Sequence, residues 1–362
     1  MSDPAPSRLR RAFKLVAFSL TPTLLLLLLA EVGLRLTGLD AASGTGSGLA
    51  EEQFGITRAD PDLFWSLRPN LARSYRGHLL RTNGLGLRGP EPGPKLPGER
   101  RILLLGESTT FGFGVDEEDT YAARLRTLLD AQPGRFSVVN AGVPAYTLFQ
   151  STIYLKQRGL ALAPDVVAIY HLANDFLPTT YRDSAHSQLG TSRSDAELYA
   201  FYRSLWIDRL VRYSAIFRAG SQAWARWRTA QAQREIAGDP THPREQILWT
   251  PAHFPHAYPV RVRPEERREL LAMLLALSRE HDFELVIIHP VYRDVPGHDE
   301  LLVDFSREHG LALVDGPAVF DASGIPRELL FSDALHPVPR GHRLLARALY
   351  DSLRTRGVLT PP

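Results

Sequence analysis

Short apolar runs alternate with amphipathic stretches from residue 101 onward. Runs of this kind are typical of strands buried on both faces of a sheet. The predicted strands are Ile102–Leu105, Phe136–Val139, Val166–Tyr170, Phe283–His289 and Leu311–Val314. Apolar residues at helical spacing predict helices over Tyr121–Ala131, Glu265–Glu280 and Arg340–Arg354. This alternation predicts an α/β fold, a flavodoxin-like doubly wound three-layer sandwich with a five-stranded parallel sheet.

The alternation is interrupted by a long insertion, residues 176–262. Ser194 and Glu197 have the spacing of a capping box and predict the start of a helical stretch, Asp195–Glu235. Three interpretations of this segment stay open: packing of its aromatic residues on the domain, contact with a membrane surface, or a wall or lid over a site at the edge of the sheet. Its aromatic residues include Tyr199, Phe201, Tyr202, Trp206, Tyr213, Phe217, Trp224, Trp227 and Trp249.

The first forty residues have the pattern of a membrane anchor. A basic head precedes the uncharged run Leu15–Ala30, and Val32–Leu36 extends it, so residues 15–36 are long enough to cross a bilayer. The positive flank predicts a single-pass protein of the cell inner membrane with its α/β domain periplasmic or extracellular. A cleaved signal peptide is the alternative, because small residues follow at Ala41-Ala42-Ser43.

The remaining sequence divides by composition. We expect a cytoplasmic head and transmembrane anchor over 1–38, a flexible Gly/Ser-rich stem over 39–50, an N-terminal extension of short strands and turns over 51–97, and the α/β domain over 98–358.

Charge and composition exclude several functions. The net charge of +2 is more than accounted for by the basic residues before position 15, so no nucleic-acid partner is expected. The absence of cysteine excludes disulfides and thiolate chemistry. Phosphate-loop and His-Glu-x-x-His motifs are missing, so we predict neither a cofactor nor a metal.

Polar residues stand where the predicted strands end. Ser108 follows the first strand, Gly142 the second and Asn174 the third, and Asp333-x-x-His336 precedes the last helix. The carboxyl ends of parallel strands share one edge of a sheet, so these groups are expected to converge.

Together these are the groups that acyl transfer requires. A serine hydroxyl needs a base to take its proton, and the base needs a carboxylate that fixes its tautomer. Gly142 allows close approach of a backbone N–H, and Asn174 carries a side-chain NH₂, so both can donate to an oxyanion.

In these blocks the sequence resembles the SGNH/GDSL hydrolases, in their membrane-anchored bacterial form. The resemblance implies that Ser108, Asp333 and His336 are catalytic and that Ser108, Gly142 and Asn174 form the oxyanion hole. Two positions depart from the family pattern: Glu107 replaces an aspartate, and Leu172 stands where a glycine is frequent.

The resemblance implies a serine esterase that acts through an acyl-serine intermediate. An O-acetylated glycan is one candidate substrate, which would make an acylated carbohydrate the partner. Two alternatives stay open: an O-acyltransferase acting on an extracytoplasmic polysaccharide, and a non-catalytic glycan-binding protein.

Overall fold

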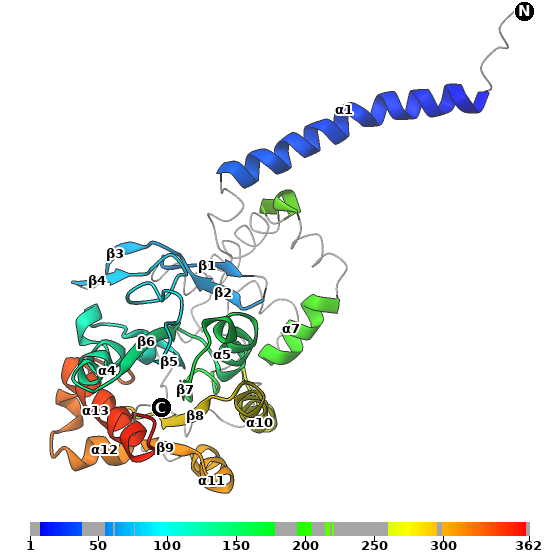
Figure 1. Ribbon diagram of the computed structural model, residues 1–362. Coiled ribbons are helices and arrows are strands. Elements are labelled where there is room, and N and C mark those ends of the chain that lie inside the picture. The colour runs from blue at the N-terminus through cyan, green and yellow to red at the C-terminus, as the bar shows by residue number, and fades with distance from the viewer. Residues whose placement is uncertain are drawn as a thin grey trace, which may run out of the picture.

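A computed structural model describes residues 8–37, 55–60, 62–75, 77–177, 194–204, 214–217, 219–220, 260–294 and 299–359. The central element is a parallel sheet with strand order β6-β5-β7-β8-β9 (Figure 1). The strands are β5 (Glu99–Gly106), β6 (Arg135–Gly142), β7 (Val166–Tyr170), β8 (Glu284–His289) and β9 (Ala312–Asp315). Of the five strands of this sheet, the first along the chain, β5, therefore lies between the second, β6, and the third, β7, which is the flavodoxin-like order. The predicted fold class is confirmed.

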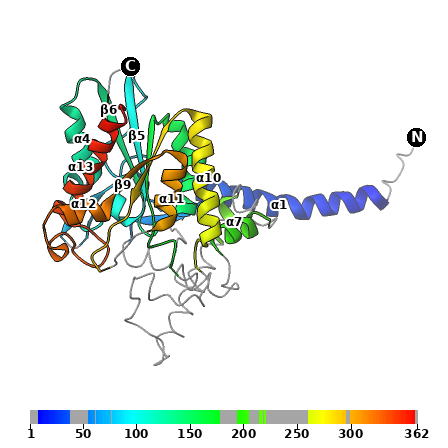
Figure 2. The same cartoon turned by 90° about the horizontal axis from the view of Figure 1, so that it is seen from below.

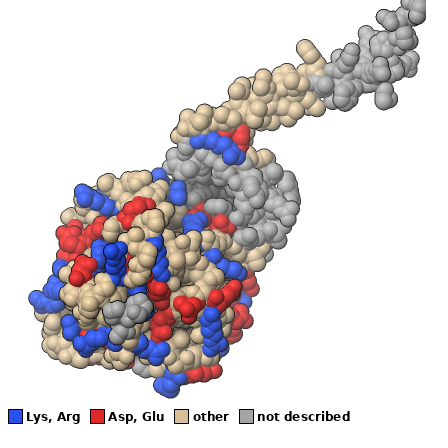
Figure 3. Space-filling view, viewed as in Figure 1, with Lys and Arg blue, Asp and Glu red and all other residues tan. Residues whose placement is uncertain are grey.

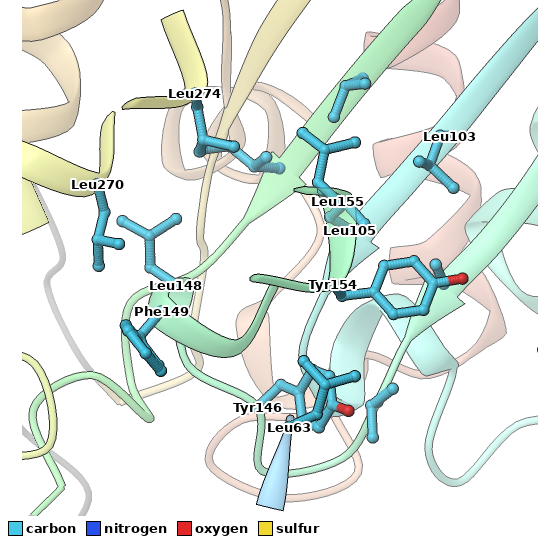
Figure 4. Packing of buried hydrophobic residues seen from close by; sticks show 14 of the residues in the cluster. Leu63, Leu103, Leu105, Tyr146, Leu148, Phe149, Tyr154, Leu155, Leu270 and Leu274 are labelled. Atoms are coloured by element: carbon cyan, nitrogen blue, oxygen red, sulfur yellow. The ribbon is translucent and has the colours of Figure 1, made fainter. Parts of the chain in front are cut away.

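Helices cover both faces of the sheet, because alternate residues of each buried strand point to opposite sides (Figure 2). One face packs against α5 (Leu148–Tyr154), α10 (Pro264–His281) and α11 (Glu300–His309). The other packs against α4 (Tyr121–Asp130), α12 (Gly316–Ala322) and α13 (Pro339–Thr355). Figure 4 shows the first face, where Leu103 and Leu105 of β5 lie near Tyr154 and Leu155.

Short irregular turns connect these elements. They are the one-turn helix α3 (Ser108–Phe111), the 3₁₀ turns η1 (Glu117–Asp119), η3 (Leu160–Leu162) and η6 (Arg327–Leu329), and the π-helical turn η2 (Leu155–Gly159) that continues α5.

The N-terminal extension forms two antiparallel hairpins, β1 (Thr57–Asp60) with β2 (Phe64–Leu67) and β3 (Ala72–Tyr75) with β4 (His78–Arg81). Its residues Leu63, Trp65 and Leu80 are buried in the same apolar cluster as α5 and α10. The extension therefore shares a hydrophobic core with the α/β domain.

The N-terminal helix α1 (Arg8–Thr37) projects away from the domain (Figure 1). Its stretch Leu20–Thr37 is apolar enough to cross a membrane, and none of that stretch is buried against the protein. A membrane anchor and a signal sequence share these properties. In the face shown in Figure 3, basic and acidic residues are mixed over the domain, whereas most of the described part of α1 is uncharged.

Only part of the insertion lies within the described residues. Helix α7 (Asp195–Ser204) begins at the predicted capping box. Within the helical stretch expected over Asp195–Glu235, residues 215–217 and 219–220 are also helical, whereas Ser214 is not: its hydroxyl accepts from Phe217 N at the start of a new turn. The rest of that stretch lies outside the described residues. Tyr199 packs edge-on against Phe149 of α5, which fits the packing interpretation for that residue. The four tryptophans of the insertion lie outside the described residues.

Candidate active site

Ser108 stands at the start of α3, directly beyond the carboxyl end of β5. The tight turn depends on Gly106, since a Cβ there would lie 2.0 Å from Thr110 Oγ1. Asn140 at the end of β6 donates to the Thr110 carbonyl at 2.8 Å and ties α3 to the sheet. As the first helical residue, Ser108 has no intrahelical acceptor for its N–H, and the described residues supply no other.

His336 lies against Ser108, 228 positions away in the sequence. The distance from His336 Nε2 to Ser108 Oγ is 2.8 Å. On the other side of the ring, Nδ1 lies 2.8 Å from Asp333 Oδ2 and 2.9 Å from Oδ1. The three predicted residues therefore form one hydrogen-bonded chain at the edge of the sheet.

The loop that carries the pair is built by Asp333 itself. Its Oδ1 accepts from Leu335 N and His336 N, both at 2.9 Å, which forms an Asx turn. Partial burial alone would raise the pKa of Asp333, but hydrogen bonds from His336 and these two N–H groups lower it well below its usual value. The ionised carboxylate can only accept, so Nδ1 carries the proton and Nε2 is free to take one from Ser108. The Phe113 ring packs against the imidazole, with centroids 5.0 Å apart.

The N–H of Gly142, the predicted oxyanion donor, is bonded within its own strand, β6. Its N–H donates to Asn140 Oδ1 at 3.0 Å. A Cβ at this position would lie 2.3 Å from Phe111 N. The residue is therefore glycine because the backbone of α3 packs directly on it.

The next turn of the chain carries an N–H that the sequence interpretation missed. Val143 N donates to Gly106 O at 3.0 Å, which places the loop after β6 beside the end of β5. Two residues later, Ala145 has φ +64°, and its N–H has no acceptor among the described residues. Nothing in an alanine side chain signals a left-handed conformation, so the sequence could not have identified this position.

Asn174 lies in the turn after β7 and reaches the same loop. Its Nδ2 donates to Tyr146 O at 3.0 Å, which uses one of the two amide hydrogens. The side chain of the predicted donor Asn174 is thus held against the loop that carries Ala145.

Glu107, which departs from the family pattern, is buried behind the serine. Tyr292 OH donates to its Oε1 at 3.1 Å and accepts from Ala173 N at 2.9 Å, so one phenol bridges the turns before Ser108 and Asn174. Burial raises the pKa of Glu107 to about 8, with a further contribution from the nearby Asp175 carboxylate. At neutral pH the side chain is therefore a neutral acid. In the described part of the chain, no three His, Asp or Glu side chains are grouped as a metal site.

A three-layer α/β sandwich with a Ser–His–Asp chain at the carboxyl edge of its sheet defines a serine ester hydrolase of the SGNH type. The model of the GDSL-like lipase/acylhydrolase family matches residues 104–344, and the chain belongs to this family.

Several solved structures are similar to the chain. LAE5, an alpha/beta hydrolase enzyme from the metagenome of Lake Arreo, Spain, is 19% identical with a TM-score of 0.42, and the match covers 72% of this chain and 96% of that one. Axe2, an acetylxylan esterase from Geobacillus stearothermophilus, is 16% identical with a TM-score of 0.42, covering 70% and 94%. A putative lipolytic protein of the G-D-S-L family from Desulfitobacterium hafniense DCB-2 is 14% identical with a TM-score of 0.35, covering 70% and 99%. No curated protein matches the chain.

Proposed function

We propose that the protein hydrolyses a carboxylic ester through an acyl-serine intermediate on Ser108. The observation that carries this proposal is the continuous contact from Ser108 Oγ to His336 Nε2 at 2.8 Å and from His336 Nδ1 to Asp333. In that geometry the hydroxyl proton has an acceptor in place before the substrate arrives.

The reaction follows from these positions. Ser108 Oγ attacks the ester carbonyl carbon, its proton passes to His336 Nε2, and the carbonyl oxygen becomes an oxyanion. When the carbonyl re-forms, the bond to the alcohol breaks and the alcohol takes the proton from Nε2. Water then attacks the acyl-serine in the same way, which releases the carboxylic acid and restores Ser108. Asp333 stabilises the imidazolium that forms in each half.

We assign three donors to the oxyanion: the N–H groups of Ser108 and Ala145 and the side chain of Asn174. Both backbone groups lack acceptors among the described residues, and the Asn174 amide has a second hydrogen to donate. Ala145 replaces Gly142 in this assignment, because the Gly142 N–H is already bonded to Asn140. Preorganised donors of this kind lower the barrier by stabilising charge that develops only in the transition state.

The side of the membrane on which the catalytic domain lies restricts the class of substrate. We infer that α1 anchors the protein with its catalytic domain outside the cytoplasm, because the apolar stretch of the helix is exposed and follows the basic residues of its first turns. Acylated carbohydrates are esters present on that side of the membrane, so an O-acetylated glycan is the substrate class we propose. A reporter fused after residue 50 should be active only outside the cytoplasm; activity only inside would contradict this orientation.

Kinetics of variants test the catalytic proposal. On short-chain esters, Ser108→Ala and His336→Gln should lose nearly all turnover, and Asp333→Asn should lose about 10⁴-fold. Asn174→Ala should lower kcat about 10²–10³-fold with little change in KM. Ser278→Ala is the matched control, because this serine is buried in α10, where its hydroxyl donates to Leu275 O. Full activity of Ser108→Ala would overturn the proposal.

A sugar acceptor distinguishes hydrolysis from acyl transfer. Wild-type protein is incubated with an acetylated polysaccharide, with and without a second sugar. Release of free acid that does not depend on the acceptor supports the hydrolase, whereas acylation of the acceptor would make the protein a transferase.

A further inference from the structure

Ala145 is held in a strained conformation by contacts from two distant segments. A left-handed φ of +64° is unfavourable for a residue with a Cβ, so surrounding contacts must stabilise it. The two peptide groups that flank its Cα determine which way its N–H points, and both have a side-chain partner.

The first partner is Trp65, from β2 of the N-terminal extension. Its indole Nε1 donates to Pro144 O at 3.3 Å. Pro144 O and Ala145 N–H belong to one planar trans peptide, so they point in opposite directions. Trp65 therefore binds the carbonyl oxygen of the peptide group whose N–H is the proposed oxyanion donor.

The second partner is Arg261, at the end of the insertion. Its guanidinium donates to Ala145 O at 2.7 Å and so fixes the following peptide group. It also donates to Gln150 Oε1 at 2.8 Å and pairs with Asp195 at 3.1 Å, and all three side chains are buried. A buried guanidinium bonded on several sides is a rigid support.

The two partners also contact each other. The Arg261 guanidinium lies over the Trp65 ring, 5.4 Å from its centroid. Asp195 additionally accepts from Thr147 Oγ1 at 2.9 Å, in the same loop as Ala145. The extension, the first residue of α7 and the end of the insertion therefore meet behind a single loop.

We propose that Trp65 and Arg261 are positioning residues that hold the two peptide groups around Ala145 and thereby aim its N–H at the oxyanion. This inference rests on the proposed function, specifically on the role of the Ala145 N–H. It assigns to Trp65 of the extension and to Arg261 of the insertion a part in turnover that needs no contact between these two side chains and the substrate.

The sharpest variant is Trp65→Phe. It removes the indole N–H but keeps an aromatic ring against Arg261 and against Tyr146, whose ring contacts Trp65 edge-on. Arg261→Lys keeps the charge but cannot hold the carbonyl, Gln150 and Asp195 together. The matched control is Arg101→Lys, because Arg101 is equally buried, pairs with Glu99 and donates to Leu162 O and Gly93 O near the opposite end of β5.

The experiment measures kcat and KM of the full-length protein in detergent, per active site titrated with a fluorophosphonate. Trp65→Phe should lower kcat about 3–10-fold and Arg261→Lys about 10–50-fold, and in both variants KM should stay within about twofold of wild type. These losses in kcat are smaller than the loss expected when an oxyanion donor is removed altogether. The double variant should lose less than the product of the two, because both act on one N–H. Arg101→Lys should lose stability without losing kcat.

Two results would overturn the inference: kcat of Trp65→Phe equal to that of wild type, or losses in Arg261→Lys no larger than in Arg101→Lys. If Arg261→Lys does not fold, Trp65→Phe decides alone. Failure of the proposed function is recognised separately, since wild-type protein would then not be titrated at Ser108.

Discussion

Replacing Glu107 by glutamine should make the protein more stable, and increasingly so as the pH rises. Glutamine keeps the volume of the side chain and the oxygen that accepts from Tyr292, but it cannot ionise. In the folded protein burial raises the pKa of Glu107 from 4.5 to about 8. The unfolded chain releases this proton near its ordinary pKa, so folding must take it up again.

The direction and size of the pH effect on stability follow from the difference between the folded and unfolded pKa values of Glu107. Below about pH 4.5 both states are protonated and the carboxyl group has no pH-dependent effect. Between pH 4.5 and about 8 the wild-type stability falls by about 1.4 kcal/mol per pH unit, and above that it levels off. The total is on the order of 5 kcal/mol, and at pH 7 on the order of 3 kcal/mol.

Denaturant unfolding of wild type and Glu107→Gln at pH 5, 7 and 9 measures the effect. The difference in free energy of unfolding should grow from pH 5 to pH 8 and then stay constant. Glu118→Gln, at an exposed position in η1, is the control and should show no such trend. A Glu107→Gln difference that is the same at every pH would refute the argument that this acid is buried in its neutral form.

Three further predictions concern groups around the nucleophile. Arg88→Met should lower the free energy of unfolding by on the order of 4 kcal/mol, measured by thermal unfolding, and should reduce turnover. The reason is that Arg88 donates to the carbonyls of Phe111, Gly112 and Val115 around the turn after Ser108. The control Arg81→Met, at an exposed position, should change neither stability nor turnover. Burial lowers the pKa of His342 in the folded protein to about 3, so the free energy of unfolding of the wild type falls as the pH drops below 6.5. In His342→Gln the free energy of unfolding should therefore fall less between pH 7 and pH 5. An equal fall in variant and wild type would contradict this. Gly142→Ala should destabilise the fold, since its Cβ would lie 2.3 Å from Phe111 N; normal stability with lost activity would instead restore Gly142 to the site.

Much of the sheet could be predicted because its strands are buried on both faces. Val166–Tyr170 was predicted with its observed bounds, and the other strands differ only at their ends. Helix α5 was missed because its sequence, LFQSTIY, lacks a charged face, although Thr147 and Gln150 form a capping box that could have signalled its start. The helical stretch expected in the insertion is interrupted at Ser214, which caps a new turn.

Sequence allowed prediction of those site residues whose side chains carry the reactive groups. Ser108, Asp333 and His336 have side chains suited to acyl transfer, and the structure brings them together. At Gly142 the sequence alone does not distinguish a glycine that permits close packing from one that exposes an N–H. Ala145, Trp65 and Arg261 act through backbone conformation and contacts from distant segments, and neither property is encoded in local spacing.

The most direct test of the central claim is to locate the covalent adduct of a fluorophosphonate probe by peptide mass spectrometry of the full-length protein. The account predicts a single modified peptide with the adduct on Ser108, no labelling of Ser108→Ala and almost none of His336→Gln. An adduct on another residue, or labelling of Ser108→Ala at the wild-type rate, would contradict the assignment of Ser108 as nucleophile.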